Sequence, residues 1–334
     1  MQSDLSRRKF IKTLMAGVAM GPAVLNFQRN TPGGIPARPL GNTGEYISIL
    51  GYGGWDTGVP KEKESIRMIH EAIEAGVTFF DNAWEYNDGR SEEVVGKALA
   101  QNGYRKKVFV MTKVCARDYK DAQNHISDSL RRLRTDHVDL LQFHSIQYEG
   151  DPERIMDPEK GAIRAVLEAK KDGKLRFIGF SGHMFPEMHL RMIDMYDWDT
   201  VQLPLNIMDA HYNSFQKKVL PVLNEKKIGA LGMKSLAGQN GRIARELNVS
   251  VQLCRKYALS LPVSTVICGM QTREELQSDL QVARNFKPLD EDQINELLDL
   301  SKELSKDGHI EQYKNFHSGF GCSFHSNVLQ NEKG

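Results

Sequence analysis

Short β-type hydrophobic runs alternate with longer helical patterns from about residue 38 onward, and this alternation restricts the fold more than any other feature. The expected strands are 47–53, 78–83, 108–114, 138–145, 177–183, 201–206, 229–235 and 264–270. The expected helices are 61–75, 91–101, 121–134, 161–171, 186–196, 215–227, 249–260 and 272–284, with a further helix at 289–304. Eight successive βα units of this total length predict an α/β fold, a (β/α)8 or TIM barrel.

The segments that flank this repeat predict two additions to the barrel. The turn-rich sequence 39–44 lies between two extended pieces, so we expect an N-terminal β-hairpin that caps the domain. The extra helix and an irregular tail follow the last βα unit. Because no linker interrupts residues 38–334, we expect them to form a single domain.

Composition excludes several classes of function. The chain has 44 Lys and Arg against 43 Asp and Glu, so it has no overall basic field for nucleic acid or anionic membranes. Its four cysteines show no Cys-x-x-Cys pair or Cys/His ligand spacing, and we therefore expect no metal site. We expect a monomer that acts on a small molecule.

Residues 1–27 have the features of an export signal. Arg7 and Arg8 precede Phe10, and a weakly apolar, Gly-containing run follows. This arrangement resembles a twin-arginine (Tat) signal, which implies contact with export machinery, a bacterial periplasmic location and no stable membrane span in the mature chain. An amphipathic anchor is the alternative. Residues 28–37 would then form a flexible lead-in to the domain.

Four ionisable side chains stand at or near the carboxyl ends of consecutive strands, where the functional face of such a barrel lies. They are Asp81, Tyr86, Lys113 and His144. A lysine within a buried strand needs an opposite charge, and Asp81 is its natural partner. Lys113 would lower the pKa of Tyr86, and His144 would donate a hydrogen bond to a carbonyl oxygen. This set of residues would protonate an oxygen as hydride reaches the carbon.

These residues lie in sequences that resemble the aldo-keto reductase family. The resemblance rests on Phe80-Asp81-Asn82-Ala83-Trp84-Glu85-Tyr86, Thr112-Lys113-Val114, Val138-Asp139-Leu140-Leu141-Gln142-Phe143-His144 and Leu50-Gly51-Tyr52-Gly53-Gly54-Trp55. It implies an NAD(P)H-dependent oxidoreductase that reduces an aldehyde or ketone, or oxidises the alcohol. The catalytic tetrad would be Asp81, Tyr86, Lys113 and His144, with no metal.

The resemblance also implies a cofactor site for NADP or NAD. Ser181 and Gln202 would hold the nicotinamide amide, although Gly182 stands where the family usually has an Asn. Met233 replaces a nicotinamide-stacking aromatic residue, and a thioether can cover a ring face. The remaining expected cofactor contacts are Gly53, Gly54, Trp55, Lys234, Ser235, Leu236, Gly238, Gly269, Thr272, Arg273, Glu275 and Asp279.

The sequence alone does not decide between NADP and NAD. Gly269 and Glu275 stand where many NADP-preferring members of the family have a Lys and an Arg, and Asp279 replaces an Asn. A carboxylate repels a 2′-phosphate and suits the ribose hydroxyl of NAD. Arg273 could compensate for the lost positive charges.

Two other functions compete with carbonyl reduction. Lys113 could act as the Schiff-base nucleophile of an aldolase, although an adjacent Asp81 raises a lysine pKa and opposes this. The barrel could also bind a dinucleotide as a sensor or regulatory subunit without turnover. Substrate contacts are expected from Trp55 and Trp84, and the tail 316–325, which contains Cys322 and two histidines, is expected to fold over the barrel mouth.

Overall fold

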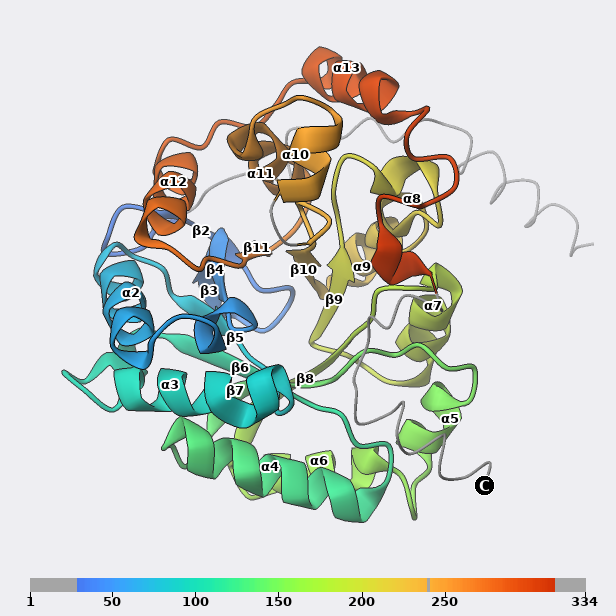
Figure 1. Cartoon of the computed structure of the whole chain (residues 1–334). Coiled ribbons are helices and arrows are strands. Elements are labelled where there is room, and N and C mark those ends of the chain that lie inside the picture. Colours follow the sequence, from blue (N-terminus) through green and yellow to red (C-terminus); the bar gives the residue numbers. More distant parts are fainter. Residues whose placement is uncertain (1–28, 239–240, 316–334) are drawn as a thin grey trace, which may run out of the picture.

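The computed structural model describes residues 29–238 and 241–315, and within them eight parallel strands close into a barrel surrounded by helices (Figure 1). Each strand pairs with the next in chain order, and the last pairs with the first. The barrel strands are β4 (Leu50–Gly53), β5 (Phe79–Asp81), β6 (Phe109–Val114), β7 (Val138–Phe143), β8 (Leu175–Ser181), β9 (Thr200–Pro204), β10 (Gly229–Met233) and β11 (Thr265–Cys268). The predicted α/β barrel is confirmed.

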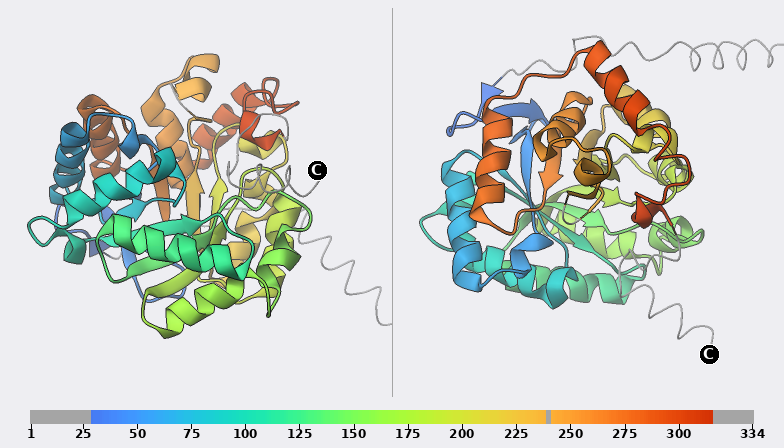
Figure 2. Two further views of the ribbon diagram at one scale, coloured as in Figure 1. Left: turned by 60° about the horizontal axis from the view of Figure 1, so that its bottom comes forward. Right: turned by 45° about the horizontal axis from the view of Figure 1, so that its top comes forward.

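Helices cover the outside of the barrel from every side, as the two views of Figure 2 show. The helices that follow barrel strands are α2 (Glu62–Glu74), α3 (Arg90–Leu99), α4 (Tyr119–Leu133), α6 (Ala162–Lys171), α7 (Pro186–Met195), α8 (Phe215–Lys218), α9 (Leu220–Lys226), α11 (Val251–Ser260) and α12 (Arg273–Arg284). The predicted final helix is α13 (Glu291–Ser301). Two short helices that the sequence patterns did not indicate are α5 (Asp151–Met156) and α10 (Arg242–Glu246).

Short 3-10 helices occupy several loops. They are η2 (Asp56–Gly58), η3 (Tyr86–Gly89), η4 (Tyr104–Lys107), η5 (Asp209–His211) and η7 (Gln312–Lys314). The helix predicted at 215–227 is broken at Val219 into α8 and α9. Pro221 explains the break, because it has no N–H to donate to the preceding turn.

The N-terminal cap is larger than the sequence indicated. Strands β2 (Pro36–Pro39) and β3 (Tyr46–Ser48) form the predicted antiparallel hairpin, and β1 (Arg29–Asn30) adds a third strand to it. Ile35 is fully buried, so the expectation of a flexible lead-in at 28–37 is wrong for the described residues from 29 onward. The first barrel strand starts at Leu50 and not at residue 47, because Tyr46–Ser48 pairs within the cap.

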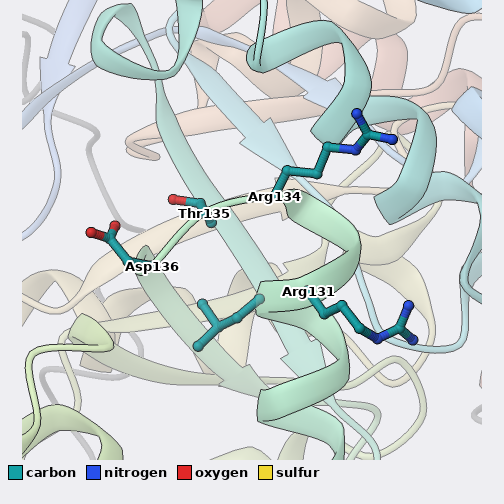
Figure 3. Close-up of a pocket in the computed structure, with 5 residues that line it drawn as sticks. Arg131, Arg134, Thr135 and Asp136 are labelled. Atoms are coloured by element: carbon teal, nitrogen blue, oxygen red, sulfur yellow. The ribbon is translucent and has the colours of Figure 1, made fainter.

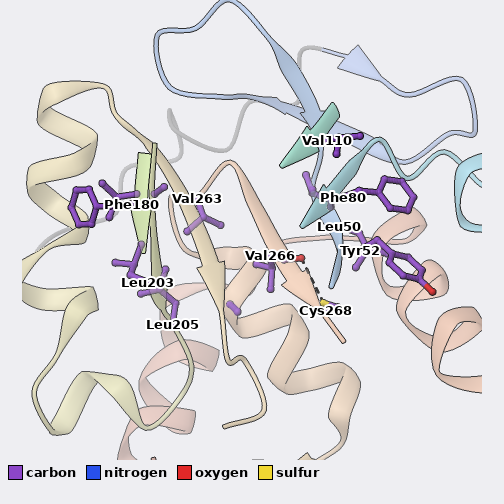
Figure 4. Close-up of a cluster of buried hydrophobic side chains, with 14 of the residues drawn as sticks. Leu50, Tyr52, Phe80, Val110, Phe180, Leu203, Leu205, Val263, Val266 and Cys268 are labelled. Carbon is purple, nitrogen blue, oxygen red and sulfur yellow. Dashed lines mark hydrogen bonds between the residues drawn. The ribbon is translucent and has the colours of Figure 1, made fainter. Parts of the chain in front are cut away.

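Two hydrophobic clusters fix the direction of the side chains at the strand ends. One fills the space between strands and helices, and Figure 4 shows part of it, including Phe80 and Val110. The other fills the barrel interior and contains Phe79, Phe109, Met111 and Leu140, with Leu40 and Ile47 from the cap. Successive side chains in a strand alternate between the two sides.

This alternation places the candidate site residues inside the barrel. Phe79 and Met111 point inward, so Asp81 and Lys113, each two residues further along its strand, point inward as well. His144 lies four residues after the inward-facing Leu140. An even number of residues separates the two, so His144 faces inward as well. The lower barrel is filled with apolar side chains, and its carboxyl end carries the polar ones.

Candidate active site

Lys113 lies at the centre of a buried polar cluster at the carboxyl ends of β5 and β6. Its ammonium forms an ion pair with Asp81, donates to the carbonyl oxygen of Asn82 at 2.9 Å and donates to the Tyr86 Oη at 3.1 Å. The side chains of Lys113 and Asp81 are 1% and 4% exposed. Burial lowers the pKa of Lys113, and the neighbouring Asp81 carboxylate opposes that shift.

The hydrogen bond from Lys113 determines the donor and acceptor roles of the Tyr86 hydroxyl. An ammonium has three N–H donors and no acceptor, so the phenolic oxygen accepts in this contact. The O–H of Tyr86 is therefore directed to a different acceptor. The Lys113 nitrogen also lies 4.8 Å from the centre of the Tyr86 ring. A cation this close favours the phenolate, which makes the hydroxyl a better proton donor.

His144 follows β7 and packs edge-on against Tyr86, with 5.5 Å between ring centroids. Its Nδ1 lies 3.0 Å from Oε1 of Glu85 and 3.5 Å from Sγ of Cys115. The residues predicted as a tetrad are thus brought together at one end of the barrel. Glu85 and Cys115 were not predicted. Their only sequence signal is their position, since Glu85 directly precedes Tyr86 and Cys115 lies two residues after Lys113.

The two tryptophans predicted to contact substrate differ in position. Trp55 is 49% exposed, and its ring lies 5.3 Å from that of Tyr86 in an edge-on contact at the mouth. Trp84 instead stacks on His125 of α4 with a centroid separation of 3.6 Å, and its indole N–H donates to Asp128. The structure therefore places Trp84 against α4 and not beside Tyr86.

Asp81 and Gln202 connect the tetrad to the predicted nicotinamide site. Gln202 donates through Nε2 to Oδ2 of Asp81 at 2.9 Å, which leaves its Oε1 buried and without a hydrogen-bond partner among the described residues. Nδ2 of Asn82 is also buried and unpartnered in that part of the chain. A carboxamide offers a donor and an acceptor together, so these two atoms fit the group that a nicotinamide ring carries.

Ser181 ends β8 on the inward-facing row, and Gly182, the next residue, faces His189 of α7. The Ser181 hydroxyl accepts from the Ser145 N–H at 3.1 Å. A Cβ at Gly182 would lie 2.5 Å from the His189 ring, so the asparagine that the family usually has would fit here only if His189 moved. His183 comes next, 6.0 Å from the Tyr313 ring, and burial together with Lys234 holds its pKa well below the usual value.

The glycines at the mouth are required for close packing. A Cβ at Gly53 would lie 2.8 Å from the Cys268 carbonyl oxygen, and one at Gly54 would lie 2.3 Å from that of Asp81. At Gly269 a Cβ would overlap the Asp56 carboxylate. These positions thus have a structural reason to be glycine, whether or not a cofactor lies beside them.

The loop after β10 brings a cation to the mouth. Lys234 has a left-handed backbone with φ +58°, its ammonium lies 5.9 Å from the Tyr313 ring, and its pKa is lowered by burial. The neighbouring Met233 is buried, while Leu236 and Gly238 are partly exposed. Ser235 accepts from the guanidinium of Arg255 at 2.6 Å.

The predicted adenosine contacts near α12 are already engaged with other protein groups. Arg255 pairs with Asp279, and both are buried. Arg273 forms two hydrogen bonds to Glu71 of α2, at 2.9 and 3.2 Å. Glu275 accepts from the backbone N–H of Gln271 at 2.7 Å and completes a capping box with Thr272.

The capping box gives the N-terminus of α12 its own anion. A helix N-terminus attracts negative charge, and here the Glu275 carboxylate accepts from the N–H groups of Gln271 and Thr272, which directly precede the helix. A pocket at the other end of the barrel is unrelated to this mouth. Figure 3 shows that it lies where α4 ends before β7, and it is lined by Leu130, Arg131, Arg134, Thr135 and Asp136.

Comparison with known proteins identifies the family. A model of the Aldo/keto reductase family matches residues 49–246. The chain belongs to the aldo/keto reductase family. It is 32% identical over 217 residues to the aldo-keto reductase YhdN of Bacillus subtilis, which covers 59% of this chain and 61% of YhdN. It is 30% identical over 218 residues to the L-galactose dehydrogenase of Arabidopsis thaliana, which covers 61% and 66%. The match spans less than two thirds of either relative.

Solved structures share the fold. The holo form of the aldo-keto reductase AKR11C1 from Bacillus halodurans has a TM-score of 0.68 and 24% identity, and the match covers 81% of this chain and 99% of that one. The glycerol dehydrogenase AKR11B4 from Gluconobacter oxydans has a TM-score of 0.62 and 21% identity, with 79% and 94% covered. In the described part of the chain, no helix is long and apolar enough to span a membrane.

Proposed function

We propose that this protein is an NAD(P)H-dependent oxidoreductase that reduces an aldehyde or ketone, or oxidises the corresponding alcohol. The observation that carries the proposal is the arrangement around Lys113. All three of its N–H groups have acceptors, namely Asp81, the Asn82 carbonyl and the Tyr86 hydroxyl. These acceptors favour the ammonium form and oppose the burial that lowers the pKa of Lys113, and one of them is the tyrosine itself.

Tyr86 is the proton donor in this proposal. Its hydroxyl oxygen accepts from Lys113, so its O–H is directed away from the ammonium and would donate to a carbonyl oxygen bound at the mouth. As negative charge develops on that oxygen, the Lys113 ammonium stabilises the phenolate that remains. His144, beside Tyr86, polarises the same oxygen. A bound reduced nicotinamide supplies the hydride, and Gln202, Ser181 and Asn82 would hold its carboxamide.

The aldolase alternative has less support from the same geometry. A Schiff-base lysine needs an unprotonated amine with a lone pair directed at the substrate. Lys113 instead uses its three donors within the protein and is buried beside a carboxylate. Borohydride treatment in the presence of carbonyl compounds should therefore leave Lys113 unmodified, and a trapped adduct there would support the aldolase.

Replacement of Tyr86 by phenylalanine tests the reductase proposal. Tyr86→Phe should reduce kcat for NAD(P)H oxidation, assayed with a panel of aldehydes and ketones, by about 10²- to 10⁴-fold. Cofactor affinity, measured by calorimetric titration, should change little. Tyr119→Phe on α4 is the matched control and should retain activity. Undiminished turnover in Tyr86→Phe would refute the assignment, and cofactor binding without turnover in the wild type would support the sensor.

We further propose a preference for NADH over NADPH. Glu275 and Asp56 place carboxylates near the start of α12, and Arg273, the cation expected to contact a phosphate, is paired with Glu71. Glu275→Gln keeps the capping box, because glutamine serves equally at that position. It should raise NADPH affinity relative to NADH by about two- to fivefold. Glu274→Gln is the control, and an unchanged ratio in Glu275→Gln would contradict the argument.

Export through a twin-arginine signal is proposed from the sequence, since residues 1–27 lie outside the described part of the chain. The double change of Arg7→Lys and Arg8→Lys should retain the protein in the cytoplasm in cell fractionation of a bacterial host. Lys12→Gln is the control and should not alter export. Equal periplasmic amounts of the double variant and the wild type would exclude this route.

A further inference from the structure

Three potential ligand atoms of different types converge beside the tetrad. They belong to Glu85, Cys115 and His144, and all of them lie within 4.8 Å of one another. Their residues follow three neighbouring strands, β5, β6 and β7, so the barrel itself brings them together. We infer that Glu85, Cys115 and His144 form a three-ligand site for a zinc-type divalent cation.

The separations match those of ligands on a tetrahedral zinc ion. Zinc bonds of about 2.3 Å to sulfur and about 2.0–2.2 Å to nitrogen or oxygen place a sulfur and a nitrogen ligand roughly 3.6 Å apart, and a nitrogen and an oxygen ligand roughly 3.4 Å apart. The observed distances are 3.5 Å from Sγ of Cys115 to Nδ1 of His144 and 3.0 Å from that nitrogen to Oε1 of Glu85. A cation therefore needs only small side-chain shifts.

Two potential ligand atoms, Oε1 of Glu85 and Sγ of Cys115, lie close to Nδ1 of His144. A hydrogen on the imidazole or on the thiol joins one pair of these atoms at a time, whereas a cation would contact all three together. The Cys115 residue is 0% exposed, and the side chains of His144 and Glu85 are 5% and 8% exposed, so little water competes for the position.

A second layer of contacts holds two of the ligand segments in place. Arg117 donates to the carbonyl oxygen of Cys115 at 3.1 Å and to that of His144 at 2.9 Å. The guanidinium is in turn held by two hydrogen bonds to Asp151, both at 3.1 Å. All these groups are buried. Such outer contacts orient metal ligands before the ion binds.

The ligand set selects the class of cation. A thiol, an imidazole and a carboxylate together suit Zn²⁺ and exclude a preference for Mg²⁺ or Ca²⁺, which take oxygen ligands. Three protein ligands leave a fourth position for water or another small ligand. A metal on Nδ1 also fixes the imidazole hydrogen on Nε2. The site is thus compatible with a hydrogen bond from His144 to a substrate oxygen.

Cobalt titration of the full-length protein tests the site without any measurement of turnover. Co²⁺ replaces Zn²⁺ in such sites and reports a bound thiolate through a charge-transfer absorption band. One equivalent of Co²⁺ should produce this band, and Zn²⁺ should displace it. Cys115→Ser should abolish the band, while Cys254→Ser, which changes another buried cysteine, should keep it. Absence of the band in the wild type, or its persistence in Cys115→Ser, would overturn the inference.

A second variant guards against misfolding of Cys115→Ser. Glu85→Gln changes the charge but almost none of the side-chain volume. It should keep the thiolate band and weaken Zn²⁺ affinity at least as much as the roughly 10- to 100-fold that loss of an outer contact costs. Unchanged affinity in this variant would remove Glu85 from the site and refute the three-ligand arrangement. Because the readout is absorption, the result is independent of whether Tyr86→Phe abolishes reduction.

Discussion

A buried lysine near the C-terminal end of the described chain should be one of the largest single contributors to stability. Lys314 of η7 is 0% exposed, and its ammonium lies 2.7 Å from Oδ1 of Asp209, 2.9 Å from Oε2 of Glu311 and 2.7 Å from the carbonyl oxygen of Tyr212. It joins the C-terminal segment to the loop after β9, next to α8 (Figure 1). Burial raises the pKa of Asp209 to about 6 even with this cation beside it.

Lys314→Met removes the cation but keeps most of the side-chain volume. Two buried carboxylates, Asp209 and Glu311, then face each other without their shared partner. Removal of one member of a buried ion pair costs about 3–5 kcal/mol, because the remaining charge stays out of water. For a chain of this size that corresponds to a fall in Tm of roughly 4–7 °C.

Urea denaturation at pH 7, followed by circular dichroism, measures this loss. Lys306→Met is the control, since its ion pair with Glu303 is 62% and 76% exposed and solvent screens it, so the change should leave the unfolding transition nearly where it is in the wild type. Adding Asp209→Asn to Lys314→Met should recover part of the loss, because it removes one of the stranded charges. A loss below about 1 kcal/mol in Lys314→Met, with no change in the slope of the transition, would refute this view of the cluster.

Three further predictions concern the barrel and its mouth. Burial lowers the pKa of His189 from 6.5 to about 4. The free energy of unfolding should therefore be highest above pH 6.5 and fall by roughly 3 kcal/mol as the pH drops toward 4, because the unfolded chain takes up a proton that the folded chain does not. The free energy of unfolding of His189→Gln should depend less on pH across this window. Gly54→Ala should destabilise the mouth by about 1–3 kcal/mol, because its Cβ would lie 2.3 Å from the Asp81 carbonyl oxygen, and a wild-type melting temperature would contradict this. Lys113→Met should lower kcat as severely as Tyr86→Phe, and a variant with full activity would exclude Lys113 from proton transfer.

The sequence predicted the barrel because its constraints are local. Each strand and helix has its own hydrophobic period, and eight repeats leave few ways to close. The polar residues within buried strands, Lys113 and His144, were detectable for the same reason, since they interrupt apolar runs. The first strand boundary was mistaken and the third strand of the cap was missed, because Tyr46–Ser48 is extended like a barrel strand and only its pairing distinguishes it.

Contacts between residues that are far apart in the sequence could not be predicted from local hydrophobic patterns. Glu85, Cys115 and His144 are about 30 residues apart in succession, so no ligand spacing marks them, and only the order of strands in the barrel places them together. The Lys314 cluster likewise depends on where the chain turns after α13. Trp84 was expected to contact substrate from the loop after β5, but the chain turns at Trp84 before η3, and the indole stacks on His125 of α4.

The differences from the family pattern are concentrated on one half of the mouth. The strand ends of β5, β6 and β7 carry the complete set of Asp81, Tyr86, Lys113 and His144, which is where a proton would be transferred. Departures from the family stand at or after the ends of β8, β10 and β11, at Gly182, Met233 and Glu275, within the predicted cofactor segments. The residues proposed for proton transfer and these three departures therefore lie at the ends of different strands. Changes in the second group can alter which dinucleotide binds without moving the atoms that handle the proton.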